Sequence, residues 1–395
     1  WVGRPRTAWL PCAARHLAQA RLRCAARLCR NGGDTLLSAM AAGLYLPCRA
    51  GFEPECAAEI VDQAARCGVA GYPKTDRDSG FVRFLGLDSG SQSLLEKRLS
   101  WRALIFARQC LPVFAELLEI NPKDRLTPVL AAVAARGQRF GDLWMEHPDA
   151  DEGRTLSGLA RSFGNALRGG LRRVGWLSAN TDLNAPRLHV ILLGGTHLLL
   201  AHSHPADSSP WPQGIPRLRL AHDAPSRSAL KLEEALLTLM SEQERSRWLK
   251  PGQRAVDLGA APGGWRWVRA RAGLRVSAVD TGPLAESAIG TGMIKHHRAD
   301  GFRWRPEHPV DWLVCDMVEQ PKRVAELISD WLVQGDCRRT IFNLKLPMKK
   351  RYAEVCQLRE LMMQRLHDAG IELQWRARQL YHDREEITVA LVPAD

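Results

Sequence analysis

The strongest constraint on the fold is a regular alternation of strand-like and helix-like segments that begins near Ser226 and continues to the C-terminus. Short apolar runs bounded by turn residues read as buried strands, and longer segments with one apolar face read as helices. The predicted strands are 254–258, 275–279, 311–315 and 340–345, and the predicted helices are 226–240, 324–333 and 352–369. This alternation predicts an α/β domain over residues 226–395, with a doubly wound parallel sheet that binds ligands at the carboxyl ends of its strands.

Residues 40–204 contain strands and helices without a regular alternation. We expect strands at 44–48, 81–85 and 142–147, helices at 52–65, 125–135 and 156–174, and a hairpin at 187–204. This mixture predicts an α+β region. Residues 205–225 contain five prolines, a composition typical of a linker between the two regions.

The N-terminal segment, residues 1–39, differs from the rest of the chain. It carries seven arginines and one acid, and it supplies about half of the formal net charge of +12. Because it begins with Trp1 and Met40 stands directly before the first predicted strand, we expect a native start at Met40 and a non-native, disordered extension before it. A basic organelle transit peptide is the alternative. The remaining positive charge favours an anionic partner such as nucleic acid.

Composition disfavours several other classes of protein. No apolar run reaches the roughly 18 residues that a membrane-spanning helix needs. Seven of the ten cysteines lie beyond residue 39, and they contain no Cys-x-x-Cys pair. Neither a zinc site nor a disulfide framework is therefore indicated, and a reducing, cytoplasmic setting is expected.

A glycine-rich turn, VDLGAAPGGW at residues 256–265, joins a predicted strand to a predicted helix. Pro262 and the glycine spacing differ from the Gly-x-Gly-x-x-Gly pattern of dinucleotide sites. Asp280 ends the next strand, where a carboxylate can accept hydrogen bonds from ribose hydroxyls, and Asp300 follows a later strand-like run and can receive an adenine amino group. A nucleoside ligand with a cationic centre and no pyrophosphate, S-adenosylmethionine, suits this pattern. Asp257 is expected to brace the turn.

Charged residues stand where predicted strands end or begin. Lys345 ends one strand, Asp316 ends its neighbour, the pair Glu385 and Glu386 opens the last strand, and Lys231 lies on the helix before the sheet. An unpaired buried ammonium costs roughly several kcal/mol, so a lysine at the end of an apolar strand needs an explanation. Two lysines flanked by two acids can handle a proton, and we interpret them as a catalytic set.

These segments resemble a known family. SRSALKLEEA with Lys231, DLGAAPGGW, CDMVEQP with Asp316, LKLP with Lys345 and REEIT are similar to the motifs of FtsJ-type ribose 2'-O-methyltransferases, which carry a Lys-Asp-Lys-Glu tetrad. CRAGFEPECAAEI, LIFARQ, GIPRL and QLYHDREE extend the resemblance, from Met40 to the C-terminus, to a branch that modifies a cytidine of bacterial 23S ribosomal RNA.

The resemblance implies a Rossmann-like methyltransferase domain that uses S-adenosylmethionine, preceded by a THUMP-type RNA-binding region at residues 40–204. Its implied partner is 23S ribosomal RNA, and neither DNA nor a membrane. It implies cofactor contacts from Ser228, Ala261, Pro262, Gly263, Gly264, Asp280, Asp300 and Asp316, a catalytic set of Lys231, Asp316, Lys345 and Glu386, and no metal.

The chemistry sets one requirement on the catalytic lysine. Lysine accepts the ribose proton only when it is neutral, so its pKa must fall from about 10.4 to roughly 7–8. Burial, Lys231 and the cofactor's sulfonium lower the pKa of Lys345, whereas Asp316 and Glu386 raise it. In the alternative, Lys345 only orients the hydroxyl and the proton leaves late.

Two further choices stay open at this point. Glu385 is the alternative to Glu386, because neighbouring residues of a strand point to opposite faces. The alternative functions are a non-catalytic RNA-binding protein that keeps the cofactor pocket and an O-methyltransferase of small molecules.

Overall fold

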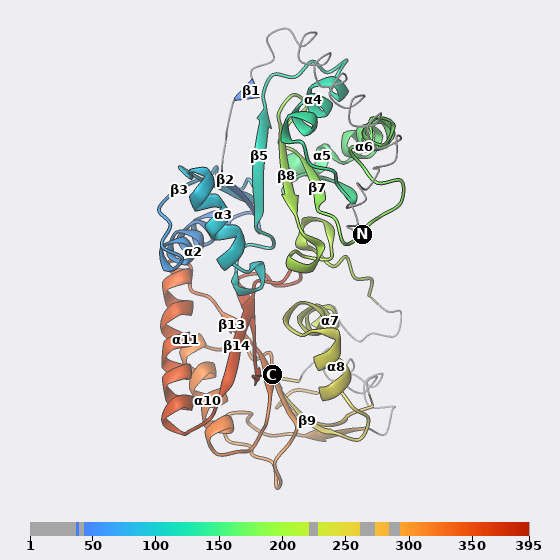
Figure 1. Ribbon diagram of the computed structural model, residues 1–395. Coiled ribbons are helices and arrows are strands. Elements are labelled where there is room, and N and C mark those ends of the chain that lie inside the picture. Colours follow the sequence, from blue (N-terminus) through green and yellow to red (C-terminus); the bar gives the residue numbers. More distant parts are fainter. Residues whose placement is uncertain (1–36, 39–42, 221–227, 261–272, 284–292, 395) are drawn as a thin grey trace, which may run out of the picture. The chain divides into compact units, whose positions relative to one another are not determined.

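The computed structural model describes residues 37–38, 43–220, 228–260, 273–283 and 293–394. The chain divides into two compact units. Unit 1 comprises residues up to 101 together with 109–214, and unit 2 comprises residues 102–108 together with 215–395. Each unit is built around one mixed sheet (Figure 1).

Unit 1 contains an eight-stranded sheet with the order β3-β4-β2-β5-β8-β7-β6, and β1 pairs with β5 beside this path. The strands are β1 (Leu37–Ser38), β2 (Gly43–Pro47), β3 (Tyr72–Lys74), β4 (Phe81–Leu85), β5 (Leu111–Leu117), β6 (Asp142–Glu146), β7 (Arg187–Leu192) and β8 (Leu198–Ser203). The helices are α2 (Glu53–Arg66), α3 (Ser89–Arg98), α4 (Leu126–Arg136), α5 (Asp151–Thr155) and α6 (Ser157–Arg173), with short 3-10 turns at Trp101–Ala103, Pro205–Asp207 and Pro212–Gly214. From β2 to β5 the elements follow the β-α-β-β-α-β succession of a ferredoxin-like fold.

Strand β5 is absent from the strands predicted from the sequence. Pro112 and Glu116 interrupt its apolar pattern, yet it is the longest strand of the unit and pairs with both β2 and β8. It therefore joins the ferredoxin-like part to the remaining strands in one sheet. The strands and helices that were predicted for this region are confirmed within a few residues.

Helix α6 packs on the part of the sheet that contains β6, β7 and β8. Phe163, Leu167 and Leu171 lie three or four residues apart on one side of the helix and are buried in the same hydrophobic cluster as the strands. Gly164 stands beside this stripe, and a Cβ added there would come within 2.6 Å of the Cγ of Met145 on β6. The glycine therefore lets the helix approach the strand closely.

Unit 2 contains a seven-stranded sheet with the order β11-β10-β9-β12-β13-β15-β14. Its strands are β9 (Arg254–Leu258), β10 (Arg275–Val279), β11 (Ile294–His297), β12 (Trp312–Cys315), β13 (Thr340–Lys345), β14 (Leu373–Arg378) and β15 (Glu386–Pro393), and its helices are α7 (Ser228–Leu239), α8 (Glu242–Trp248), α10 (Pro321–Val333) and α11 (Arg351–Asp368). Strands β9 to β13 pair in parallel, whereas β15 pairs antiparallel with β13 and with β14. The predicted doubly wound α/β domain is confirmed, with the correction that its last two strands form an antiparallel ribbon.

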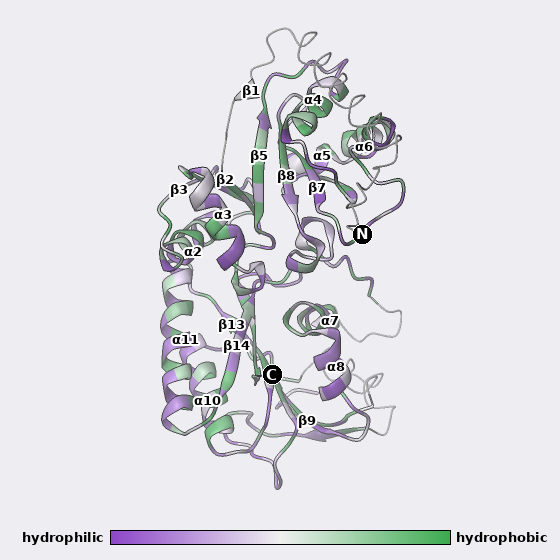
Figure 2. Cartoon of the chain, viewed as in Figure 1, coloured by the Kyte–Doolittle hydropathy of each residue, from purple (hydrophilic) through white to green (hydrophobic). Residues whose placement is uncertain are grey.

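Helices cover both faces of this sheet. Helices α7 and α8 lie on one side, and α10 and α11 lie on the other (Figure 1). Both α10 and α11 carry hydrophobic and hydrophilic residues, as expected for helices with one face on a sheet (Figure 2). Within the described ranges, no helix combines the length and the apolar character that crossing a bilayer requires.

One short part of unit 2 comes from the front of the sequence. In segment 102–108, the carbonyl oxygen of Ile105 accepts a hydrogen bond from the backbone nitrogen of Gln379 at 2.8 Å. The buried Arg378 guanidinium donates to the carbonyl oxygen of Arg108 at 3.2 Å. The segment thus braces the chain just after β14, which composition does not predict.

Candidate active site

The candidate site lies where β12 and β13 end and β15 begins. Lys345, the last residue of β13, stands directly opposite Glu386, the first residue of β15, and Asn343 stands opposite Thr388. Alternate residues of a strand share a face, so these four side chains lie on the same face of the antiparallel ribbon. The residues between them are apolar and buried. The strand register alone therefore sets two facing polar pairs.

Glu386 joins the two lysines. One of its carboxylate oxygens accepts a hydrogen bond from the Nζ atom of Lys345, and the other accepts one from the Nζ atom of Lys231. Asp316 also lies beside both ammonium groups, with Oδ1 3.6 Å from the Nζ atom of Lys345 and Oδ2 3.6 Å from that of Lys231. The structure brings the four residues singled out in the sequence together from α7, β13, β15 and the turn after β12.

Exposure distinguishes the two lysines. The side chain of Lys231 is 15% exposed and that of Lys345 is 28% exposed, while that of Glu386 is only 3% exposed. Burial is the largest influence on the pKa of Lys345 and lowers it; Asp316 opposes this effect and Lys231 reinforces it, and the pKa lies below its ordinary value. A lowered pKa is the direction that a lysine base requires.

Glu385 lies outside this cluster. Its side chain is 64% exposed and accepts a hydrogen bond at 2.6 Å from the guanidinium of Arg351. Because neighbouring strand residues point to opposite faces, only one of the two glutamates can meet the lysines. The structure brings Glu386 to them.

Three residues that the sequence analysis missed continue the hydrogen-bond network behind Asp316. The Nδ2 atom of Asn343 donates to Oδ1 of Asp316 at 2.7 Å, and the hydroxyl of Thr388 lies 2.7 Å from Oδ1 of Asn343. The same hydroxyl lies 3.2 and 3.1 Å from the two carboxyl oxygens of Asp383, which also accepts from the backbone nitrogen of Leu380 at 2.9 Å. Burial raises the pKa of Asp383 to about 8. The available signal was a polar residue inside each apolar strand, but only the register shows that the two residues meet.

Helix α7 is fixed by Glu234, which lies three residues after Lys231. The buried carboxylate of Glu234 accepts hydrogen bonds from the backbone nitrogens of Tyr381 and His382 at 2.7 and 3.1 Å. It also lies 2.7 Å from Nδ1 of His382. These contacts tie the helix that carries Lys231 to the loop before β15, and the sequence analysis did not single out Glu234.

The expected cofactor turn lies mostly beyond the described residues. Ala261, Pro262, Gly263 and Gly264 fall outside the described residues. Gly259, just after β9, has a φ of +76°, and a Cβ added there would come within 2.7 Å of the Cγ of Met317. The start of the turn therefore approaches the end of β12 as closely as glycine alone permits.

The remaining expected cofactor residues lie at strand ends and at the start of a helix. Asp280 follows β10, its Oδ1 accepts from the backbone nitrogen of Gly282 at 2.7 Å, and its own nitrogen donates to the carbonyl of His297 at 3.2 Å. Asp300 lies three residues after β11 with its side chain 53% exposed. Ser228 begins α7. The two acids thus follow neighbouring parallel strands, at the edge of the sheet where ligands are expected.

Three family models match successive parts of the chain. They are described as RlmM ferredoxin-like domain (residues 41–111), Ribosomal RNA large subunit methyltransferase M, N-terminal (residues 124–204), and FtsJ-like methyltransferase (residues 224–344). The first describes residues 41–111, the part from β2 to β5, as ferredoxin-like, so the expected THUMP-type character is not what this model describes. The α+β character of the region and the methyltransferase domain are confirmed.

Relatives cover nearly the whole matched length. The Ribosomal RNA large subunit methyltransferase M of Xanthomonas euvesicatoria pv. vesicatoria (strain 85-10) is 58% identical over 347 residues, which is 88% of this chain and 98% of that protein. The protein of the same name from Xanthomonas campestris pv. campestris (strain B100) is 57% identical with the same coverage. The crystal structure of TrmN from Thermus thermophilus is 18% identical, covers 89% of this chain and 99% of that one, and has a TM-score of 0.33.

Proposed function

Because the chain belongs to the ribosomal RNA large subunit methyltransferase M family, we propose that it transfers a methyl group from S-adenosylmethionine to the ribose 2'-hydroxyl of a cytidine in 23S ribosomal RNA. The observation that carries this proposal is the contact of Lys345 and Lys231 with the single carboxylate of Glu386, beside Asp316. The cofactor supplies a methyl group already activated by its sulfonium. The protein must therefore orient the hydroxyl and remove its proton.

Lys345 is the proposed proton acceptor. Its side chain is the more exposed of the two lysines, and its pKa is lowered by burial. In its neutral form, Nζ accepts the proton of the 2'-hydroxyl while the ribose oxygen forms a bond to the methyl carbon. The electron pair of the broken carbon–sulfur bond stays on sulfur. Lys231 supplies a fixed positive charge beside this transfer.

The two carboxylates act as orienting groups in this scheme. Glu386 and Asp316 each lie beside both lysines, so each one fixes the distance between the two nitrogens. A carboxylate that bridges two ammonium groups keeps their side chains in one geometry. Loss of either acid would leave the base misplaced rather than absent.

The cofactor residues fit a nucleoside at the carboxyl edge of β9 and β10. The close approach at Gly259 supports a turn that lets the backbone contact a ligand, and the strand order reverses beside β9, where such sheets bind nucleotides. Asp280 would bind the ribose hydroxyls and Asp300 the adenine amino group. Both carboxylates accept hydrogen bonds from such donors.

We assign the grip on RNA to unit 1 and place the protein in the cytoplasm, where ribosomal RNA of a bacterium is found. The four arginines and the absence of acids on α6 support this assignment.

The test uses the full chain, radiolabelled cofactor and 23S ribosomal RNA that lacks the modification. A 2'-O-methyl group blocks alkaline cleavage of the following phosphodiester, so label should appear in alkali-resistant dinucleotides that contain cytidine. Label in mononucleotides would instead indicate methylation of a base. Failure to label any RNA, with the cofactor bound, would reject the proposal.

A further inference from the structure

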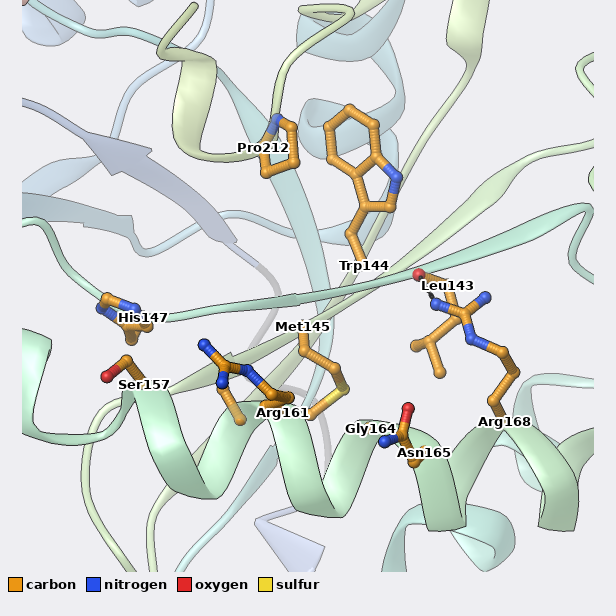
Figure 3. A pocket seen from close by; sticks show the side chains of 11 residues that line it. Leu143, Trp144, Met145, His147, Ser157, Arg161, Gly164, Asn165, Arg168 and Pro212 are labelled. Atoms are coloured by element: carbon orange, nitrogen blue, oxygen red, sulfur yellow. Dashed lines mark hydrogen bonds between the residues drawn. The ribbon is translucent and has the colours of Figure 1, made fainter. Parts of the chain in front are cut away.

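A groove of about 350 Å³ lies between helix α6 and strand β6 in unit 1 (Figure 3). Among the described strands β6 pairs only with β7, so it is an edge strand of the sheet. The volume falls in the range of about 300–1,000 Å³ that is typical of sites for small ligands or parts of larger ones. The proposed reaction does not use this groove.

Polar side chains of α6 line the groove. Ser157, Arg161, Asn165 and Arg168 stand on the side of the helix that faces β6 (Figure 3). Their spacing of three or four residues places them on one helical face. If this side of the helix only packed on the strand, that face would be apolar.

The polar groups of this groove are largely unengaged. Ser157, Arg161 and Asn165 are exposed, and within the described ranges no hydrogen bond or ion pair engages their side chains. Arg168 donates to the carbonyl oxygen of Leu143 at 2.8 Å and pairs with Asp142 at 3.4 Å. The lining contains no acid. A second hollow of unit 1, of about 490 Å³, is lined by Glu96, which pairs with His202 at 3.4 Å and disfavours anions there.

We propose that the groove between α6 and β6 binds the backbone of the ribosomal RNA substrate, with a phosphate on Arg161 and ribose or base edges on Asn165 and Ser157. This inference rests on the proposed function and deepens it. A guanidinium fits a phosphate through two parallel hydrogen bonds. Amide and hydroxyl groups read single-stranded nucleotides, whose edges are accessible.

The experiment compares Arg161→Ala and Asn165→Ala with a matched control, Arg173→Ala, in the full chain. Arg173 is exposed on the same helix but does not line the groove. Steady-state methylation of unmodified 23S RNA gives kcat and KM for each variant at several salt concentrations. Arg161→Ala should raise the KM for RNA about tenfold with unchanged kcat and cofactor affinity, and it should reduce the salt slope of binding by about 0.7, the value for one single-strand phosphate contact. Arg161→Lys should restore the slope.

The outcomes separate this inference from the proposed function. If the wild-type chain methylates RNA but Arg161→Ala and Arg173→Ala raise KM equally, the positive charge of the helix acts without a groove and the inference is wrong. If a polyglutamate peptide protects Asn165→Cys from thiol labelling and the RNA does not, the groove binds acidic protein segments instead. If the wild-type chain transfers no methyl to RNA, the proposed function itself has failed.

A second inference concerns the hydrogen-bond chain that links Asp316, Asn343, Thr388 and Asp383 in unit 2. It rests on different observations from the first inference. Its hydrogen-bond directions are fixed from one end. The amide nitrogen of Asn343 donates to Asp316, so the amide oxygen must accept from the hydroxyl of Thr388. A hydroxyl has one proton, so Thr388 can only accept from Asp383. One oxygen of Asp383 already accepts from Leu380, and the other must then carry a proton.

We infer that Asp383 is protonated in the resting enzyme and acts, through Thr388 and Asn343, as a positioning residue that holds Asp316 between the two lysines. The charges around Asp383 support this. Asp316 and Glu386 already face Lys231 and Lys345, and Glu234 on α7 lies 2.7 Å from Nδ1 of His382. Another negative charge would be unbalanced. The pKa of Asp383 is raised, which also favours the protonated carboxyl.

The test compares Asp383→Asn, Thr388→Val and the control Thr340→Val. An asparagine at 383 can donate to Thr388 and accept from Leu380, as a protonated aspartate does, whereas valine at 388 breaks the chain with little change of shape. Thr340 is buried on β13 and its hydroxyl has no hydrogen-bond partner within the described residues, so its replacement controls for a lost buried hydroxyl. Single-turnover rates at saturating RNA and cofactor are measured from pH 6 to 10.

Thr388→Val should slow methyl transfer about tenfold and shift the pH at which the rate is half-maximal, with the KM for RNA unchanged. Asp383→Asn should keep the rate within about threefold of wild type and remove the decline above about pH 8 that follows ionisation of Asp383. If Asp383→Asn is as slow as Thr388→Val, a charged carboxylate is needed and the inference is wrong. If Thr388→Val slows the reaction without moving the pH profile, the hydrogen-bond chain from Asp316 to Asp383 has only a structural role and the inference is wrong. Thermal unfolding of each variant identifies failure to fold. The protonation of Asp383 is then tested by infrared spectroscopy, in which the band of a protonated carboxyl should be present in wild type and lost in Asp383→Asn.

Discussion

Each unit contains a buried polar cluster among its described residues, and these two clusters differ in how they stabilise charge. In unit 1, the buried carboxylate of Glu146 on β6 contacts Nδ1 of His189 on β7 at 2.6 Å, and Nε2 of that ring lies 2.8 Å from the hydroxyl of Ser203 on β8. This cluster is closed, because its members satisfy one another. In unit 2, Lys345 and Lys231 reach the edge of the sheet with exposed fractions of 28% and 15%. That cluster is open at its lysines.

The ionisation of the buried carboxyl groups follows this difference. Burial, the largest influence, raises the pKa of Glu146, but His189, the backbone nitrogen of Gln213 and the charge of Arg187 outweigh it, and the pKa lies below its ordinary value. Asp383 is buried as deeply, and its pKa is raised to about 8. The closed cluster stabilises a charge, whereas the open one keeps its innermost acid neutral behind a lysine whose pKa is lowered. We conclude that the first cluster holds strands together and the second prepares a base.

Replacement of Lys345 by alanine should have the largest effect on activity. Removal of a general base lowers rates by about 10²–10⁴-fold, so we expect a fall of about 10³-fold in kcat, while cofactor binding measured by calorimetry stays within about twofold. The unfolding free energy should change by less than about 1 kcal/mol, because the lysine is not needed to close a core. Activity close to wild type would mean that Lys345 is not the base, and the contrast between the two clusters would then fail.

The pH profile sharpens the assignment of the base. If neutral Lys345 takes the proton, kcat rises with pH through the lowered pKa of Lys345, before the decline above about pH 8 that ionisation of Asp383 is expected to cause. Lys345→Arg, which stays charged over the accessible range, should remain inactive at every pH. Recovery of activity by arginine would favour a lysine that only orients the hydroxyl.

Glu386→Gln should lower kcat by about 100-fold, because the neutral amide of glutamine has no negative charge with which to bridge the two ammonium groups. The neighbouring Glu385→Gln is the matched control. It removes only an exposed contact to Arg351, so activity should stay within about twofold of wild type. The two variants are compared by single-turnover methyl transfer. A larger loss of activity for Glu385→Gln than for Glu386→Gln would mean that Glu385, and not Glu386, acts with the two lysines.

The sequence carried more of the open cluster than of the closed one. Lys345 was recognisable because a charge at the end of an apolar strand costs free energy and needs a reason, and Asp316 ends the neighbouring strand. Lys231, on a helix, was singled out with them as the second lysine beside two acids. The resemblance already implied Glu386, with Glu385 as the alternative, and the register with β13 brings Glu386 opposite Lys345. Asn343 and Asp383 were not predicted, because their roles depend on cross-strand pairing and on a loop, which hydrophobic periodicity does not encode.

Long-range pairing also explains what was missed in the fold. The parallel strands and their helices were predicted, since each has a local hydrophobic pattern. Strand β5, the antiparallel ribbon of β14 and β15, and segment 102–108 in unit 2 depend on contacts between distant parts of the chain. The groove of α6 was equally hidden, because arginines on a helix ordinarily indicate only a solvated face.

Glu146→Gln should act on stability and leave the chemistry intact. It removes the charge that His189 and Gln213 stabilise in a buried position, so we expect a loss of about 2 kcal/mol in the unfolding free energy at pH 7, measured by urea titration. The methylation rate per folded molecule should not change. A loss of kcat without a loss of stability would give the closed cluster a part in the reaction and break the comparison.

The pH dependence of stability provides the finest test, because the two buried acids have opposite signs. The lowered pKa of Glu146 gives stability that is present above the ordinary glutamate pKa of about 4.3 and is lost as pH falls through the folded-state value. The raised pKa of Asp383 makes the folded state bind a proton that the unfolded state has released, so stability falls as pH rises from about 4 to about 8. Relative to wild type, Asp383→Asn should therefore gain stability with increasing pH, by at most about 1.4 kcal/mol per pH unit in that window. Glu146→Gln should keep a constant offset from wild type there, because its own change with pH falls below about pH 4.3. Parallel curves for the two variants in urea titrations at pH 5, 6, 7 and 8 would mean that Asp383 is ionised like Glu146, and the two clusters would then differ only in their exposure.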